Sequence, residues 1–201
     1  MSYQAGTASV CITPDEPLWL AGYAARTGPA RGKISDLFVS ALALEDASGR
    51  RFVMASMDII AITPIIAHPV AEAVSARHGL SREQLLLVPT HTHYGPEFRP
   101  DKRPFFNIPD EYGSQIFLTA ANLAAALTQA IDQSLERLEP VRLFARQTAA
   151  GFAHNRRRHG VVAGTPSAED VVDHDVPVLE CVDMSGKRKT SPSTSRFPSG
   201  A

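Results

Sequence analysis

The chain has 201 residues, the length of one domain or a domain and a half. Hydrophobic residues make up 44% and charged residues 20%, which is enough to build a core and excludes a chain that is disordered throughout. Lys and Arg total 20 against 21 Asp and Glu, so the sequence lacks the basic charge of a nucleic-acid binder. Cys11 and Cys181 cannot form a disulfide framework and are expected to be buried or strand thiols.

The N-terminal segment 1–14 shows no basic stretch followed by an apolar one, so it does not have the pattern of a signal peptide. No segment approaches the roughly 18 to 20 unbroken apolar residues that cross a bilayer. These features predict a soluble, cytoplasmic protein without a transmembrane segment.

Strand and helix signals alternate along the chain, which predicts an α/β fold with a layered sheet. Segment 52–60 is almost entirely apolar and is expected to be a central strand covered on both faces, and segment 85–88 is expected to be buried. Glycines and prolines between residues 15 and 33 predict a long loop, and long loops in compact domains are often functional. The other expected strands are 8–13, 38–44, 141–148 and 176–182.

Two helices are expected. Thr63 followed by Pro64 predicts a helix start, and Gly79 is suited to the C-terminal cap of that helix. The second helix is predicted by an apolar stripe that ends before Pro140. Its members are Ile116, Leu123, Leu127, Ile131, Leu135 and Leu138.

The pair His91 and His93 is the strongest candidate for a site, because it directly follows the expected strand 85–88. Residues i and i+2 of an extended chain point to the same face, so both imidazoles are expected to project from the carboxyl end of that strand. Open α/β sheets bind ligands at this edge, and imidazole is the commonest metal ligand. The alternative is that loop carbonyls satisfy both rings. The other histidines are not expected to form a site, because His68 and His78 fall on the expected first helix at the surface, and His154, His159 and His174 lie in polar loops where a histidine is usually solvated.

Two further polar features stand out. Asp58 lies in an apolar strand, where a carboxylate is costly unless it is paired, so it is a metal ligand, a partner of a histidine, or a cap of a backbone turn. The basic segment 155–158 is a solvated loop or supplies an arginine that binds a carboxylate or an oxyanion.

Together, several motifs resemble the neutral/alkaline (non-lysosomal) ceramidases, in the N-terminal part of their catalytic domain. The motifs are Ile12-Thr13-Pro14, Leu20-Ala21-Gly22-Tyr23, the strand ending in Asp58, Thr90-His91-Thr92-His93-Tyr94-Gly95-Pro96, Asn155-Arg156-Arg157 and the hairpin 172–186. The resemblance implies a zinc amidohydrolase that acts on the N-acyl bond of ceramide-like lipids. It implies that His91 ligates Zn²⁺ and that His93 and Arg156 lie in the active site. The family usually has serine where Tyr94 stands, which alters the expected pocket wall.

The resemblance also implies that the sequence lacks most of the zinc ligands of the family. The family takes its other zinc ligands, a second histidine, a glutamate and a tyrosine, from later positions, and segment 187–201 contains none of these residue types. We therefore expect residues 1–186 to form an incomplete catalytic domain and residues 187–201 a disordered, low-complexity tail. The expected consequences are weak or absent zinc binding, impaired hydrolysis and self-association through uncovered surfaces.

Other classes fit less well. A barrel amidohydrolase would place the histidine pair on its first strand and needs a longer chain. A metallo-β-lactamase would have an aspartate soon after the pair, and a serine hydrolase would have a G-x-S-x-G motif, which the sequence lacks. The remaining alternative is a non-catalytic module, derived from the same fold, that binds a lipid or a protein.

Overall fold

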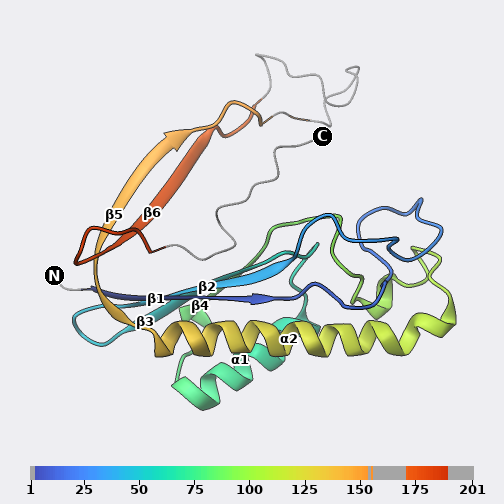
Figure 1. The fold of residues 1–201 in the computed structure, drawn as a ribbon, viewed down its shortest axis with the longest axis horizontal. Coiled ribbons are helices and arrows are strands. Elements are labelled where there is room, and N and C mark those ends of the chain that lie inside the picture. Colours follow the sequence, from blue (N-terminus) through green and yellow to red (C-terminus); the bar gives the residue numbers. More distant parts are fainter. Residues whose placement is uncertain (1–2, 154, 156–170, 190–201) are drawn as a thin grey trace.

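A computed structural model describes residues 3–153, 155 and 171–189 (Figure 1). Its centre is a six-stranded sheet in the order β4-β3-β2-β1-β5-β6, in which β3 and β4 are parallel and the other neighbours antiparallel. The strands are β1 (Tyr3–Cys11), β2 (Phe38–Glu45), β3 (Arg51–Met57), β4 (Leu85–Pro89), β5 (Glu139–Ala149) and β6 (Asp175–Asp183). The helices are α1 (Pro64–His78) and α2 (Gly113–Glu136), with short 3₁₀ helices η1 (Arg82–Gln84), η2 (Pro100–Lys102) and η3 (Asp110–Tyr112). The predicted α/β class and mixed layered sheet are confirmed.

Helix α1 makes the crossover between the parallel strands β3 and β4, and both of its ends follow the sequence signals. It starts at Pro64, directly after Thr63. Gly79 adopts a left-handed conformation with φ 67°, and its N–H donates to the carbonyl of Ser75 at 2.9 Å. The predicted start and end of this helix are therefore confirmed.

The main core lies between the sheet and the two helices, which cover one side of the sheet (Figure 1). Alternate residues of the central strands point into it, as the two-residue period of a strand requires. These are Val39, Ala41 and Ala43 of β2 and Val53, Ala55 and Met57 of β3. From α2 the same core receives Leu123, Leu127 and Ile131, members of the predicted apolar stripe.

Glycine at position 6 allows α2 to lie against β1. A Cβ atom on Gly6 would stand 2.0 Å from the carbonyl oxygen of Ser134 and 2.8 Å from the carbonyl carbon of Arg137. Both atoms belong to the backbone at the end of α2, so neither can move aside as a flexible side chain would. The close approach of this helix to the sheet therefore depends on the missing side chain.

The opposite side of the sheet is covered only in part by the described residues, because Val141, Leu143 and Cys181 of β5 and β6 pack there against Leu42 and Leu44 of β2. The expectation that 52–60 is covered on both faces is wrong. Met54 on this side of β3 is 38% exposed. On β4, an edge strand, Leu85 is buried and Leu87 packs against the core, whereas Leu86 is 43% and Val88 38% exposed. Segment 85–88 is therefore buried on one face only, and the expectation that it is buried throughout is wrong. The reason is that the described helices pack on one face only, while the apolar sequence of these strands has the pattern of a strand with two covers.

The hairpin β5–β6 leaves the plane of the sheet on the side away from the helices (Figure 1). Strand β5 pairs with β1 only through residues 139–141 and then pairs with β6. After the turn at Gly186 the chain pairs back on β6, since the N–H of Lys189 donates to the carbonyl of Cys181 at 2.8 Å. Residues 187–189 open the segment expected to be a disordered tail, and residues 190–201 lie outside the described residues. Among the described helices, none has the length and apolar character to cross a membrane.

The long loop 15–33 is irregular, as predicted, and its first part lies against the segment that follows the histidine pair. The N–H of Ala21 donates to the carbonyl of Gly95 at 2.9 Å, and the N–H of Glu97 donates to the carbonyl of Trp19 at 2.7 Å. A second hydrophobic cluster, formed by Trp19, Phe106, Ile108 and Ile116, supports this contact. Two segments that are distant in sequence are thereby held side by side.

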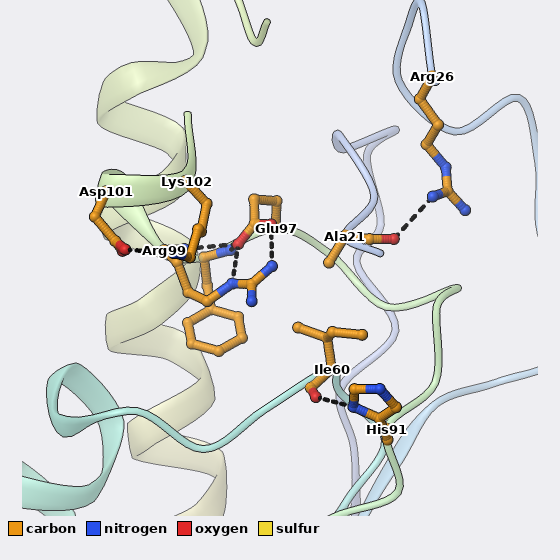
Figure 2. A network of polar contacts seen from close by, with 9 residues as sticks. Ala21, Arg26, Ile60, His91, Glu97, Arg99, Asp101 and Lys102 are labelled. Atoms are coloured by element: carbon orange, nitrogen blue, oxygen red, sulfur yellow. Dashed lines mark hydrogen bonds and ion pairs between the residues drawn. The ribbon is translucent and has the colours of Figure 1, made fainter. Parts of the chain in front are cut away.

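A buried ion pair fixes the chain just after the histidines. Glu97 is only 2% exposed, and its carboxylate accepts two hydrogen bonds from the Arg99 guanidinium, at 2.7 Å from Nε and 2.6 Å from Nη2 (Figure 2). It also accepts from the main-chain N–H groups of Phe98 and Arg99 at 3.0 and 2.9 Å. Because both charges are largely removed from water, each depends on the other to remain buried.

The first prediction concerns Gly6. Replacement of Gly6 by alanine should lower the free energy of unfolding by about 2 kcal/mol or more, because the new methyl group overlaps the backbone of α2. Urea denaturation measures this value. The control is Gly28→Ala, where the added Cβ would have no atom within 4 Å, and its effect should stay within about 0.5 kcal/mol. Equal stabilities of the two variants would contradict the packing described.

The second prediction concerns the buried ion pair. Glu97→Gln should lower the free energy of unfolding by about 3 kcal/mol, because it leaves the guanidinium of Arg99 buried without its counter-charge. Asp101→Asn is the control, since the pair of Asp101 with Lys102 is exposed and should contribute less than about 1 kcal/mol. A loss for Glu97→Gln no larger than that of the control would show that the pair does not hold this segment.

Candidate functional site

The carboxyl ends of β3 and β4 lie at the same edge of the sheet because these two strands are parallel. Main-chain hydrogen bonds then join the two segments that leave them. The N–H of Thr90 donates to the carbonyl of Met57 at 2.9 Å, and the N–H of His91 donates to the carbonyl of Ile59 at 3.1 Å. The loop that carries both histidines is therefore fastened to the chain that follows β3.

The two imidazoles lie together, but not for the predicted reason. Strand β4 ends at Pro89, and His91 has a φ of 61°, so the backbone between the histidines is not extended. The expectation that an extended strand points both side chains to one face is wrong. The left-handed turn at His91 brings the rings to a centroid distance of 5.1 Å with an interplanar angle of 76°.

A hydrogen bond fixes the orientation of the His91 ring. Its Nδ1 lies 2.7 Å from the carbonyl oxygen of Ile60 (Figure 2). A carbonyl oxygen only accepts, so Nδ1 carries the proton and Nε2 of the neutral ring keeps its lone pair. A histidine whose second nitrogen donates to a carbonyl in this way is suited to bind a metal ion. The side chain of His91 is exposed, which leaves Nε2 accessible.

The long loop 15–33 determines the space available to the ring of His93. Gly22 has a φ of 100°, and a Cβ atom there would stand 2.5 Å from Cγ of His93, so only glycine leaves room for this imidazole. The ring of Tyr23 contacts His93 edge-on at a centroid distance of 4.7 Å. The loop 15–33 thus forms one wall of the site.

Arg26 joins this wall to the histidine loop. Its Nη1 donates to the carbonyl of Ala21 at 2.8 Å (Figure 2), and its Nη2 donates to the carbonyl of His93 at 2.7 Å. The guanidinium also lies 4.9 Å from the ring centre of Tyr23 and 5.7 Å from that of Tyr94. No sequence motif points to Arg26, and the only signal for it is its position in a long loop rich in glycine and proline.

Asp58 has a main-chain partner. Its Oδ2 accepts a hydrogen bond from the N–H of Phe38 at 2.9 Å, and its own N–H donates to the carbonyl of Phe38 at 2.9 Å. None of the three alternatives describes this contact: the carboxylate binds the main chain at the start of the neighbouring strand β2 rather than a backbone turn. Asp58 thereby helps to fix the exit of β3.

The remaining candidate residues are elsewhere or are not described. Arg156 lies outside the described residues, as do His154 and His159. On helix α1, His68 is exposed, and Nε2 of His78 lies 2.7 Å from Oδ1 of Asp132. Nδ1 of His174 lies 3.1 Å from the carbonyl oxygen of Ala150. These three contribute nothing to the site at the sheet edge.

The donors at this edge fit a zinc ion in part. His91 has the tautomer of a ligand, and the second imidazole lies beside it. Catalytic zinc ordinarily has three protein ligands. Within the described residues, no group of three or more His, Cys, Asp or Glu is placed to hold a metal ion. The nearby carboxylate of Glu97 is committed to Arg99, so it does not complete the set.

Comparison with solved structures identifies the fold. The crystal structure of neutral ceramidase from Pseudomonas aeruginosa matches with a TM-score of 0.74 and 25% sequence identity over 94% of this chain. A structure of a ceramidase complexed with C2 matches with a TM-score of 0.74 and 24% identity over 94% of this chain. No family model matches the sequence, and no curated protein matches it significantly.

In both comparisons the matched region covers only 30% of the ceramidase chain. The chain therefore has a ceramidase-like fold and corresponds to about 30% of the length of a neutral ceramidase.

Proposed function

We propose that this chain supplies the His91 part of a zinc-dependent amide hydrolase site, of the kind that cleaves the N-acyl bond of ceramide-like lipids. The observation that carries the proposal is the hydrogen bond from Nδ1 of His91 to the carbonyl of Ile60, which leaves Nε2 as a ligand nitrogen at the edge of a ceramidase-like sheet. The sequence resemblance points to the same residue.

The residues have separate roles in this proposal. His91 would hold Zn²⁺ through Nε2, and His93, packed against Gly22 and Tyr23, would line the substrate site. Arg156, assigned to the active site by the resemblance alone, lies outside the described residues. Zinc held there would polarise the carbonyl group of an amide substrate.

The described donors do not make a full catalytic site, so we expect the chain by itself to bind zinc weakly and to hydrolyse amides slowly or not at all. Affinity for zinc depends on the number and geometry of the ligands. One well-oriented imidazole with a second beside it falls short of the three protein ligands of a catalytic zinc site.

The second candidate function is a non-catalytic module that binds a lipid or a protein. The observation in its favour is the side of the sheet away from the helices, where Met54, Leu86 and Val88 form exposed apolar surface on the neighbouring strands β3 and β4. A binding module of this kind would not need zinc. Co-sedimentation with lipid vesicles in the presence of a chelator separates it from the first candidate.

The third prediction is a titration of the full chain with Zn²⁺ by calorimetry. We expect one weak site, with a dissociation constant in the micromolar range or above, and a loss of affinity of at least about tenfold in His91→Ala. His68→Ala is the matched control, because His68 is exposed on α1 and should leave the affinity unchanged.

Two results would contradict the proposal. Equal zinc affinities of wild type and His91→Ala would remove His91 from the site. Stoichiometric zinc of nanomolar affinity, together with hydrolysis of a fluorescent ceramide, would show that the chain holds a complete site rather than part of one.

A further inference from the structure

We propose that Arg26 is a positioning residue for the pair of imidazoles, and that it acts by clamping the main chain of His93 to the loop 15–33. As far as the ligand is concerned, this inference rests on the proposed zinc site. Its geometric part, the placement of the His93 ring, stands on contacts within the chain.

The side chain of Arg26 bridges two main-chain carbonyls. One belongs to Ala21, in its own loop, and the other to His93, in the loop after β4. The hydrogen bonds measure 2.8 and 2.7 Å, within the range of charge-assisted bonds, which are about twice as strong as neutral ones. A guanidinium is a planar group with several donors in fixed directions, so it can hold both oxygens at once.

The bridge acts where the main-chain contacts between the two loops do not reach. Those contacts join Ala21 to Gly95 and Trp19 to Glu97, beyond the histidines. Arg26 binds the carbonyl of His93 itself. It therefore fixes the residue whose ring packs between Tyr23, at 4.7 Å, and His91, at 5.1 Å.

Two tyrosine rings hold the guanidinium in place. Its central carbon lies 4.9 Å from the ring centre of Tyr23 and 5.7 Å from that of Tyr94, distances at which a cation is attracted to the face of an aromatic ring. Tyr94 directly follows His93, so Arg26 is attached to the histidine loop by both a hydrogen bond and a ring contact. Loss of the guanidinium would release both contacts.

A residue that only stabilised the loop would change the free energy of unfolding without specifically changing the imidazole pair. The fourth prediction therefore uses two readouts on the full chain: nuclear Overhauser contacts between the rings of Tyr23 and His93, and the affinity for Zn²⁺ alone. The variants are Arg26→Ala and Arg26→Lys. The control is Arg50→Ala, which removes an exposed guanidinium that pairs with Asp46 in the β2–β3 turn.

We expect the contact between Tyr23 and His93 in the wild type and the control, and its loss in Arg26→Ala. Zinc affinity should fall by less than the roughly tenfold loss expected for His91→Ala, because Arg26 positions the ring beside the proposed ligand and not the ligand itself. Arg26→Lys should behave like Arg26→Ala, because one ammonium group cannot reproduce the fork that holds both carbonyls. Millimolar guanidinium ion, compared with sodium at equal ionic strength, should restore the contact in Arg26→Ala.

The outcomes separate the positioning role from the proposed function. If the wild type binds no zinc but the ring contact depends on Arg26, the zinc proposal fails and the positioning role remains. A ring contact absent from the wild type, or retained in Arg26→Ala, would overturn the positioning role. Full zinc affinity and a retained ring contact in Arg26→Lys would show that the charge matters and the bridge does not.

Discussion

The hydrogen bonds between the exits of β3 and β4 are the constraint on which the candidate site depends. Because the two strands are parallel, residues 57–60 and residues 90–91 leave the sheet side by side. The carbonyls of Met57 and Ile59 bind the main chain of the histidine loop, and that of Ile60 binds the His91 ring. The sheet thus determines both the position of this histidine and the nitrogen that it presents to solvent.

A second set of contacts comes from the long loop. Gly22 makes room for the His93 ring, and Arg26 joins the loop to the carbonyl of His93. The buried ion pair of Glu97 and Arg99 then fixes the chain at the end of the histidine loop. The site is therefore built from two segments that are far apart in sequence, the loop 15–33 and the loop after β4, although its two histidines are close neighbours in sequence.

Local sequence signals were sufficient to predict where the two helices lie in the sequence. Helix α1 begins at Pro64 and ends before Gly79, as these residue types indicate, because both act within one turn of the chain; the side chain of Thr63 makes no capping hydrogen bond. Which faces of the strands are covered could not be predicted from local signals. The apolar residues of β3 and β4 indicate that burial of these strands is favourable. Whether one or two layers cover them depends on how the whole chain folds.

The same difference between local signals and long-range contacts applies to the candidate site. The spacing of His91 and His93 predicted two neighbouring imidazoles, but it did not predict the left-handed conformation of His91 or its contacts with the chain after β3. Arg26 lies 67 residues before its partner His93, and no local pattern reports a contact over that separation. Asp58 was recognised as anomalous, and the structure shows it holding the N–H of Phe38.

The central claim is that the fold presents His91 with a bare Nε2, ready to bind a metal ion. The fifth prediction tests this claim by long-range proton–nitrogen correlation NMR of the imidazole rings, at a pH where histidine is neutral. We expect His91 to be protonated on Nδ1 and to carry its lone pair on Nε2. A His91 ring protonated on Nε2 would contradict it, because the hydrogen bond to Ile60 would then be absent and the ligand nitrogen would be blocked.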